Sequence, residues 1–361
     1  MLTIQRLYIK EFFKLMSLIG TSLASIFSIL DFIDKIDEFI PGRPTMKNLL
    51  LYIVFNFPKY LLYLLPVALL TCSLFIFSQA ARNKEFVAIK AAGCKLKAVF
   101  YPFLISGVLI TIFAFFVGEI IVPDFSRRSN ELKNTIKNKS KDRKFMFKEG
   151  TLWLRATDGS PVRIELYVHE MKIAKGLSIF VFNENFLRER IEAEEAKWEY
   201  VQGSKGVWRL KNAIVYNIMD KKINIFPEFD YPYLESPDFF NEGIKKSEEM
   251  GIGELYRYIE RLERAGFKNK KLIVDMNSKV AYPLINMFMI LLGISLSIKS
   301  KFSGSLFAAG LGLLISIFYW IVYTLALSMG YAGIVEPAIA AWIVPISFGV
   351  VTIFLFKNIK E

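Results

Sequence analysis

The chain has 361 residues, of which 53% are hydrophobic and only 22% are charged. A soluble protein of this length would ordinarily form two domains, but the distribution of charge excludes that interpretation. Six uncharged runs divide the chain: Leu15–Leu30, Tyr60–Ala81, Ala98–Gly118, Val280–Ile298, Phe302–Val335 and Pro337–Phe356. A helix that crosses the bilayer core needs roughly 20 apolar residues, and each run can supply one. The sequence therefore predicts an α-helical polytopic membrane protein with six transmembrane helices.

Residues that usually carry enzymatic chemistry are scarce. Two cysteines, Cys72 and Cys94, and one histidine, His169, provide neither a disulfide framework, nor a zinc-binding histidine cluster, nor a Ser-His-Asp triad. We also find no G-x-x-x-x-G-K-[ST] phosphate-binding motif. The net charge of +12 could suggest nucleic acid, but many basic residues flank the uncharged runs, where membrane insertion explains them. We expect no enzyme, no cofactor or metal in this chain and no nucleic-acid partner.

Lysine and arginine residues gather on one side of the predicted helices. They precede the first run, fill the segment between the second and third runs and follow the sixth, whereas the segment 31–38 is rich in acids. The positive-inside rule then places both termini in the cytoplasm and residues 123–279 outside, which is the periplasm in a bacterium with two membranes. A cleaved signal peptide over residues 1–30 is the alternative, but the amphipathic stretch that follows favours a continuing helix.

The outer segment is long enough for a domain and shows strand-like runs separated by turns. These runs are Thr151–Ala156, Val162–His169, Leu177–Phe182, Val207–Leu210, Ala213–Ile218 and Lys222–Phe226. Short strands with glycine-containing turns predict an all-β sandwich or jelly roll. The stretch Glu189–Tyr200 is ambiguous between helix and strand, and the apolar spacing from Leu255 to Leu262 predicts a short helix ending near Gly266. The predicted organisation is transmembrane helices 1–3 in residues 1–122, a β-jellyroll-like domain with flanking helices in 123–275 and transmembrane helices 4–6 in 276–361.

The segment between the second and third runs offers a surface for a partner. Ala80–Ala92 is predicted to be a cytoplasmic helix with Gly93 as the left-handed residue at its C-terminus. Glu85 is its only acid, and Phe86 belongs to its apolar face. Glu85 can pair with Arg82 three residues earlier, on an interfacial helix. Alternatively, this is a coupling helix that docks in the groove of an ATPase, where Glu85 would meet an arginine.

Charged residues also follow the third run. Nine basic residues lie between Arg127 and Lys148, and Arg127, Arg128 and Lys133 are the closest of these to the membrane. They can form a solvated helix face or attract anionic headgroups and phosphorylated glycolipid. Glu119 lies at the outer end of the third run, where we expect it to cap or orient the exit into the outer domain.

Seven groups of short motifs together point to a family. They are Arg82-x-x-Glu85 with Ala91-Ala92-Gly93, Gly118-Glu119-x-x-x-Pro123, Gly150-Thr151-Leu152-Trp153, Phe182-Asn183-Glu184-Asn185, Val207-Trp208-Arg209-Leu210, Tyr258-Ile259 with Gly266, and Ser278-Lys279-x-x-x-Pro283-Leu284. In this order, across nearly the whole chain and with the predicted topology, they resemble the lipopolysaccharide export permeases LptF and LptG. The stretches in the β domain are more similar to LptG.

The resemblance implies a set of partners and a transport role. Such a permease pairs with a second, LptF-like permease in the bacterial inner membrane and takes lipopolysaccharide from the outer leaflet of that membrane. A cytoplasmic ABC ATPase dimer, LptB-like, binds the ATP and drives the lipid towards a periplasmic bridge protein, LptC/LptA-like. In this family the acid that matches Glu85 contacts the ATPase, which favours a coupling role for Glu85, with Arg82 and Phe86 beside it.

The lipid-binding residues of the family match less well. Family members carry lysines above the first span that meet lipid phosphates, whereas here Lys35 stands alone among acids. Either the role has moved to Arg127, Arg128 and Lys133, or the glycolipid carries fewer phosphates. The fifth span offers an apolar wall for the lipid, with Leu306, Leu311 and Phe318, although the same residues also suit plain exposure to the bilayer. The alternative function is a non-transporting membrane scaffold or regulator of a periplasmic partner, coupled to an ABC ATPase.

Overall fold

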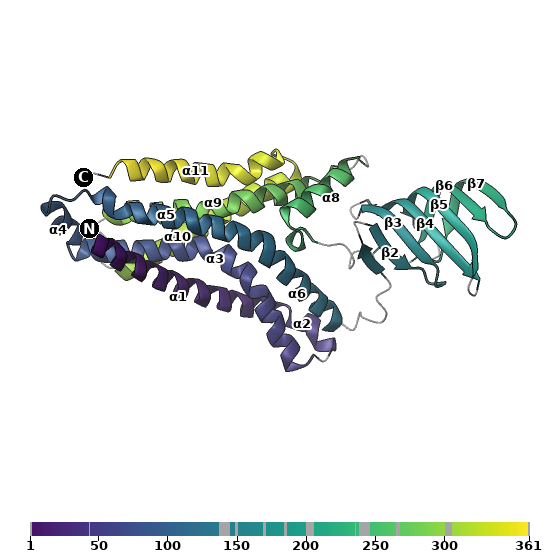
Figure 1. Ribbon diagram of the computed structural model, residues 1–361, viewed down its shortest axis with the longest axis horizontal. Helices are drawn as coiled ribbons and strands as arrows, with labels where there is room; N and C mark the ends of the chain where they lie inside the picture. Colours follow the sequence, from purple (N-terminus) through teal and green to yellow (C-terminus); the bar gives the residue numbers. More distant parts are fainter. Residues whose placement is uncertain are drawn as a thin grey trace. The chain divides into compact units, whose positions relative to one another are not determined.

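The chain folds into two compact units in the computed structural model (Figure 1). The helical unit comprises Met1–Lys139, Ser247–Tyr256 and Lys270–Glu361, and the β unit comprises Ser140–Lys246 and Arg257–Asn269. The structure describes residues 2–42, 44–136, 145–148, 151–168, 171–183, 186–199, 206–234, 236–237, 246–264, 268–299 and 305–359. The basic residues between 137 and 144, His169 and Gly266 therefore lie outside the described residues.

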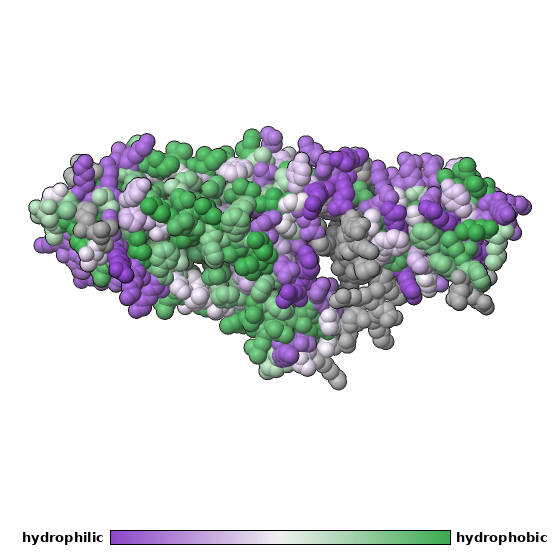
Figure 2. Space-filling model, in the orientation of Figure 1, coloured by the Kyte–Doolittle hydropathy of each residue, from purple (hydrophilic) through white to green (hydrophobic). Residues whose placement is uncertain are grey.

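The helical unit contains the long apolar helices. Its elements are α1 (Leu2–Asp34), α2 (Ile36–Phe39), η1 (Ile40–Gly42), α3 (Met46–Arg82), α4 (Glu85–Ala91), α5 (Leu96–Phe116), η2 (Val117–Ile121), α6 (Val122–Ile136), η3 (Ser247–Glu249), α9 (Lys270–Lys299), α10 (Ser305–Ala332) and α11 (Pro337–Lys357). Six helices among the described residues are long and apolar enough to cross a membrane, which confirms the number predicted from the uncharged runs. Figure 2 shows hydrophobic side chains over the middle of this unit and hydrophilic side chains towards its ends.

The helix α3 is the centre of the helical unit. It packs against α1, α9 and α10, while α11 packs against α9. Two glycines allow close approach: a Cβ atom on Gly293 of α9 would lie 2.5 Å from the Cβ of Ser73, and one on Gly312 of α10 would lie 3.2 Å from the Cα of Thr71. Small residues have this role in membrane helices because lipid supplies no hydrophobic force between helices, so close packing must stabilise their contact.

The β unit is built on one antiparallel sheet. Its strands are β1 (Phe145–Lys148), β2 (Thr151–Arg155), β3 (Pro161–Val168), β4 (Ile173–Asn183), β5 (Phe186–Glu199), β6 (Val207–Asn217) and β7 (Lys222–Tyr231), and they pair in sequence order. The ambiguous stretch Glu189–Tyr200 is a strand up to Glu199, because Ile191 and Ala193 alternate with charged residues and face the core. The short helix α8 (Ile252–Arg264) follows the sheet, as the apolar spacing predicts.

Side chains of the sheet form a hydrophobic core that contains the fully buried Trp208. The chain after β7 returns to the turn between β2 and β3, where the Thr157 amide donates to the Tyr233 carbonyl at 2.8 Å. The Tyr231 hydroxyl donates to Asp158 at 3.0 Å, and burial together with this carboxylate raises the pKa of Tyr231. The described strands form an up-and-down meander, whereas a jelly roll contains two Greek keys. The all-β character is thus present, and the jelly roll is not confirmed.

Candidate functional site

The helix α4 lies at the same end of the helical unit as both chain termini, here called the α4 end (Figure 1). The sequence predicted one continuous helix over Ala80–Ala92, and this is wrong. The helix α3 ends at Arg82, and α4 begins at Glu85 after Lys84, whose φ of 58° is left-handed and interrupts the helix. At its other end Gly93 has a φ of 73°, as predicted for the C-terminal residue.

The Glu85 carboxylate is held by two donors of its own chain. The Tyr8 hydroxyl of α1 donates to one oxygen, and the Asn83 amide donates to the other at 3.1 Å. The predicted Glu85–Arg82 pair is not among the ion pairs of the described residues. A carboxylate oxygen accepts more than one hydrogen bond, so both oxygens keep room for an external donor.

The side chains of α4 divide into an anchoring face and an outward face. Phe86 is only 7% exposed and packs edge-on against Phe100 of α5, with ring centroids 5.8 Å apart. Phe86 therefore anchors α4 rather than presenting its ring to a partner, which revises the prediction from the sequence. Val87 is 63% exposed, and Ala88 and Ala91 are also exposed. Small side chains at Ala88 and Ala91 and the exposed Val87 thus form the apolar part of the outward face, beside the exposed Lys90.

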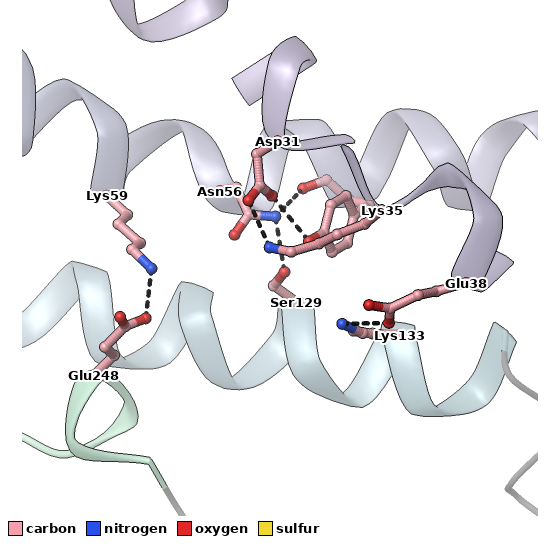
Figure 3. Close-up of polar contacts among 9 residues, drawn as sticks. Asp31, Lys35, Glu38, Asn56, Lys59, Ser129, Lys133 and Glu248 are labelled. Carbon is pink, nitrogen blue, oxygen red and sulfur yellow. Dashed lines mark hydrogen bonds and ion pairs between the residues drawn. The ribbon is translucent and has the colours of Figure 1, made fainter. Parts of the chain in front are cut away.

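Polar side chains gather at the opposite end of the helical unit, where they join α1, α2, α3, α6 and η3 (Figure 1 and Figure 3). We call this group the polar belt; it comprises Asp31, Lys35, Glu38, Asn56, Lys59, Ser129, Lys133 and Glu248. Lys35 contacts Asp31 at 2.5 Å, and the Tyr52 hydroxyl donates to the same carboxylate at 3.0 Å. Burial by itself lowers the pKa of Lys35, but the hydrogen bond and the charge of Asp31 outweigh it, and the pKa is raised. Lys35, the lone lysine among the acids above the first span and a predicted lipid contact, is thus bound to an acid of the same chain.

The three predicted cations of α6 also have contacts within the chain. Lys133 pairs with Glu38 at 2.7 Å, and Arg128 pairs with Asp124 at 3.3 Å. Arg127 donates from Nη2 to the Glu249 carbonyl at 3.5 Å. The acids above the first span, which set this sequence apart from the family pattern, therefore include partners for two predicted cations, Lys35 and Lys133.

Sequence reasoning missed Lys59, which pairs with Glu248 at 2.5 Å (Figure 3). These residues are 189 positions apart, so no local pattern could have indicated the contact. Asn56 of α3 likewise donates to the Ser129 hydroxyl of α6 at 3.0 Å. The belt therefore joins the α2 end of α3 to α6 and η3.

Glu119 caps the first turn of α8. Its two carboxylate oxygens lie 2.7 and 2.8 Å from the backbone nitrogen of Ile252. A helix N-terminus has unpaired amides and a partial positive charge, both of which favour an anion. Glu119 itself lies in η2, a π-helical segment between α5 and α6. Glu119 therefore does cap a helix, but that helix is α8, which follows the strands in the chain, and not the exit from the third run where the sequence placed the cap.

Of the residues predicted to form an apolar wall on α10, two are exposed and one packs inside the helical unit. Leu306 is 81% exposed and Phe318 is 60% exposed, so both can contact lipid. Leu311 instead packs against the buried core of the helical unit, which corrects its placement on the wall. The exposed Leu314 lies with Phe318 on α10, and α1 carries the exposed Leu18.

These features define a class of protein. Six apolar helices that can cross a bilayer, exposed apolar faces on α1 and α10 and a small surface helix with a fixed carboxylate describe a multi-pass integral membrane protein. The chain belongs to the lipopolysaccharide export system permease family LptF/LptG, whose model matches residues 6–358. It is accordingly a permease component of lipopolysaccharide export and not an enzyme by itself. No curated protein matches the chain.

Proposed function

We propose that the chain is the LptG-type permease subunit of an ABC-type complex in the bacterial inner membrane. It pairs with an LptF-like permease and extracts lipopolysaccharide, which passes to a periplasmic bridge protein. A partner ATPase dimer binds the ATP. Family membership supports this proposal, and the β-domain stretches around Trp153 and Trp208 favour LptG.

In the proposed orientation both termini and α4 face the cytoplasm, and the β unit lies in the periplasm. The charge asymmetry of the sequence supports this orientation. The common location of α4 and the two termini at one end of the helical unit is consistent with it (Figure 1). Lipid would contact the exposed apolar faces of α1 and α10, with its anionic headgroup near the polar belt.

The observation that carries the coupling proposal is the fixed carboxylate of Glu85 beside the exposed face of α4. We propose that an arginine of the ATPase binds this carboxylate. A hydrogen bond to a charged group contributes about 1.5–3 kcal/mol. Glu85→Ala should therefore weaken binding of the ATPase about tenfold or more.

The test uses the complex purified with its own partners and reconstituted in lipid nanodiscs with lipopolysaccharide. Binding of the ATPase, ATP hydrolysis and ATP-dependent transfer of the lipid to the bridge protein are measured together. Glu131→Ala, which removes an exposed carboxylate on α6, is the matched control and should behave like the parent. Normal ATPase binding and transfer by Glu85→Ala would contradict the coupling role.

A second candidate function is a scaffold that does not transport lipid. The internal pairing of Lys35 and Lys133 favours it, because paired cations attract lipid phosphates less strongly. The same reconstitution separates the two functions. A scaffold would hydrolyse ATP with its partners but show no ATP-dependent transfer of lipopolysaccharide, whereas a permease couples the two.

A further inference from the structure

We propose that Tyr8 is a positioning residue for Glu85: its hydroxyl fixes the carboxylate in the orientation in which α4 presents it to the ATPase. The inference rests on the coupling function proposed above and adds a residue to it. Tyr8 lies in the first helix and Glu85 lies 77 positions later, so the contact exists only in the folded chain.

The hydrogen bond is made in a setting that restricts both partners. Tyr8 is only 5% exposed, so its hydroxyl has little access to water. A tyrosine hydroxyl donates one proton, and in Tyr8 that proton is directed to Glu85. Asn83 approaches the other oxygen, and together the two donors hold the carboxylate from two sides.

The ring of Tyr8 is itself held by an aromatic cluster that joins the helices around α4. It packs against Phe77 of α3 with ring centroids 6.2 Å apart, and Phe77 packs against Phe100 of α5 at 5.4 Å. Phe100 in turn contacts Phe86 of α4. Aromatic rings have few rotatable bonds and contribute a large packed area. The packed ring of Tyr8 therefore holds its hydroxyl in one position relative to α4.

This arrangement resembles the support that precise binding sites require. A charged side chain that recognises a partner binds best when a second group holds it in the productive rotamer, because less side-chain freedom is then lost on binding. Without the hydroxyl, Glu85 would keep its charge but sample other rotamers. Tyr8 therefore acts through Glu85 and need not touch the ATPase.

The experiment is a double-mutant cycle in the full complex, read as the Kd of the co-purifying ATPase for the permease in nanodiscs. Tyr8→Phe removes only the hydroxyl and should weaken binding about fivefold in the parent. In the Glu85→Ala background the same change should have no further effect. Tyr101→Phe, at an exposed tyrosine of α5, is the control and should leave the Kd unchanged.

A structural role alone predicts something else. If Tyr8→Phe weakens binding equally in both backgrounds, the hydroxyl stabilises the fold and does not act through Glu85, and the inference is overturned. An unchanged Kd for Tyr8→Phe in the parent overturns it as well, while the coupling role stands if Glu85→Ala still weakens binding. If Glu85→Ala itself has no effect, the coupling function and this inference fail together.

Discussion

At the residue scale, individual carboxylates pair with lysines of the polar belt and so limit how readily those lysines can bind an anionic headgroup. Asp31, Glu38 and Glu248 each lie against a lysine of the polar belt. The Glu38 and Glu248 carboxylates are exposed. Exposed ion pairs contribute only about 0.2–1 kcal/mol, because water screens both charges and two long side chains lose freedom. An anionic headgroup can therefore compete with such a carboxylate. With the headgroup near the belt, as proposed above, the acids and the cations would form an exchangeable layer rather than a permanently neutral one.

This view predicts opposite effects for the two partners of one pair. Glu38→Gln should release Lys133 and increase photocrosslinking of lipopolysaccharide to the purified complex, by about two- to fivefold. Lys133→Gln should decrease it. Crosslinked lipid is quantified by immunoblotting after ultraviolet exposure.

The control for net charge is Glu131→Gln on the same helix as Lys133, which also adds one positive charge but lies at an exposed position. It should leave crosslinking nearly unchanged. Equal crosslinking by all three variants and the parent would mean that the Lys133–Glu38 pair is structural and that the lipid phosphates bind elsewhere.

At the scale of elements, the contacts of α3 set the arrangement of the helical unit. At Gly293 of α9 and Gly312 of α10 the absence of a side chain lets these helices approach α3 closely. In α4 the large side chains face the other helices instead: Phe86 and Ile89 are buried, whereas the small Ala88 and Ala91 are exposed. Side-chain size thus decides which faces meet other helices and which stay accessible.

Replacement of Gly293 by alanine should destabilise the helical unit. The new Cβ would lie 2.5 Å from the Cβ of Ser73 and 3.2 Å from the Leu70 carbonyl oxygen, so the backbones of α9 and α3 must separate. Overpacking of this kind costs about 1–3 kcal/mol. The apparent Tm in detergent should fall by several degrees.

The matched control is Gly310→Ala on α10, because a Cβ added there meets no atom within 4 Å in the described structure. Alanine is the better helix former by about 1 kcal/mol, so this variant should be as stable as the parent or more so. A Gly293→Ala variant as stable as Gly310→Ala would show that the close approach of α9 and α3 is not needed for stability.

At the scale of the whole molecule, the proposed topology assigns the β unit and the α4 end of the helical unit to different compartments. A cysteine that replaces the exposed Met219 in the β unit should react with a membrane-impermeant maleimide in intact spheroplasts. The native Cys94, half-exposed near α4, should react only after lysis, and Cys72 is buried. Labelling is followed by mass spectrometry. The reverse pattern of labelling would contradict the orientation and the role of α4 in ATPase contact.

Much of this architecture is accessible from the sequence because it rests on local patterns. Uncharged runs indicate the membrane-spanning helices, and alternation of apolar and polar residues indicates most of the strands. Both patterns arise because buried positions recur with the residue period of a helix or a strand. The break at Lys84 was missed because Ala80–Ala92 has the composition of a continuous helix. The long strand β5 was ambiguous because its charged face resembles that of a helix.

The sequence by itself determined the six apolar helices, the β character of the inserted unit and the family motifs, all of which depend on residues close together in the chain. Only the tertiary structure decided which charges meet. Lys59 and Glu248 are 189 positions apart and Tyr8 and Glu85 are 77 apart, and their contacts follow from how the helices pack. It also separated the exposed Phe318 from the partly buried Leu311, which packs against the core, because burial depends on which neighbouring helix covers a position.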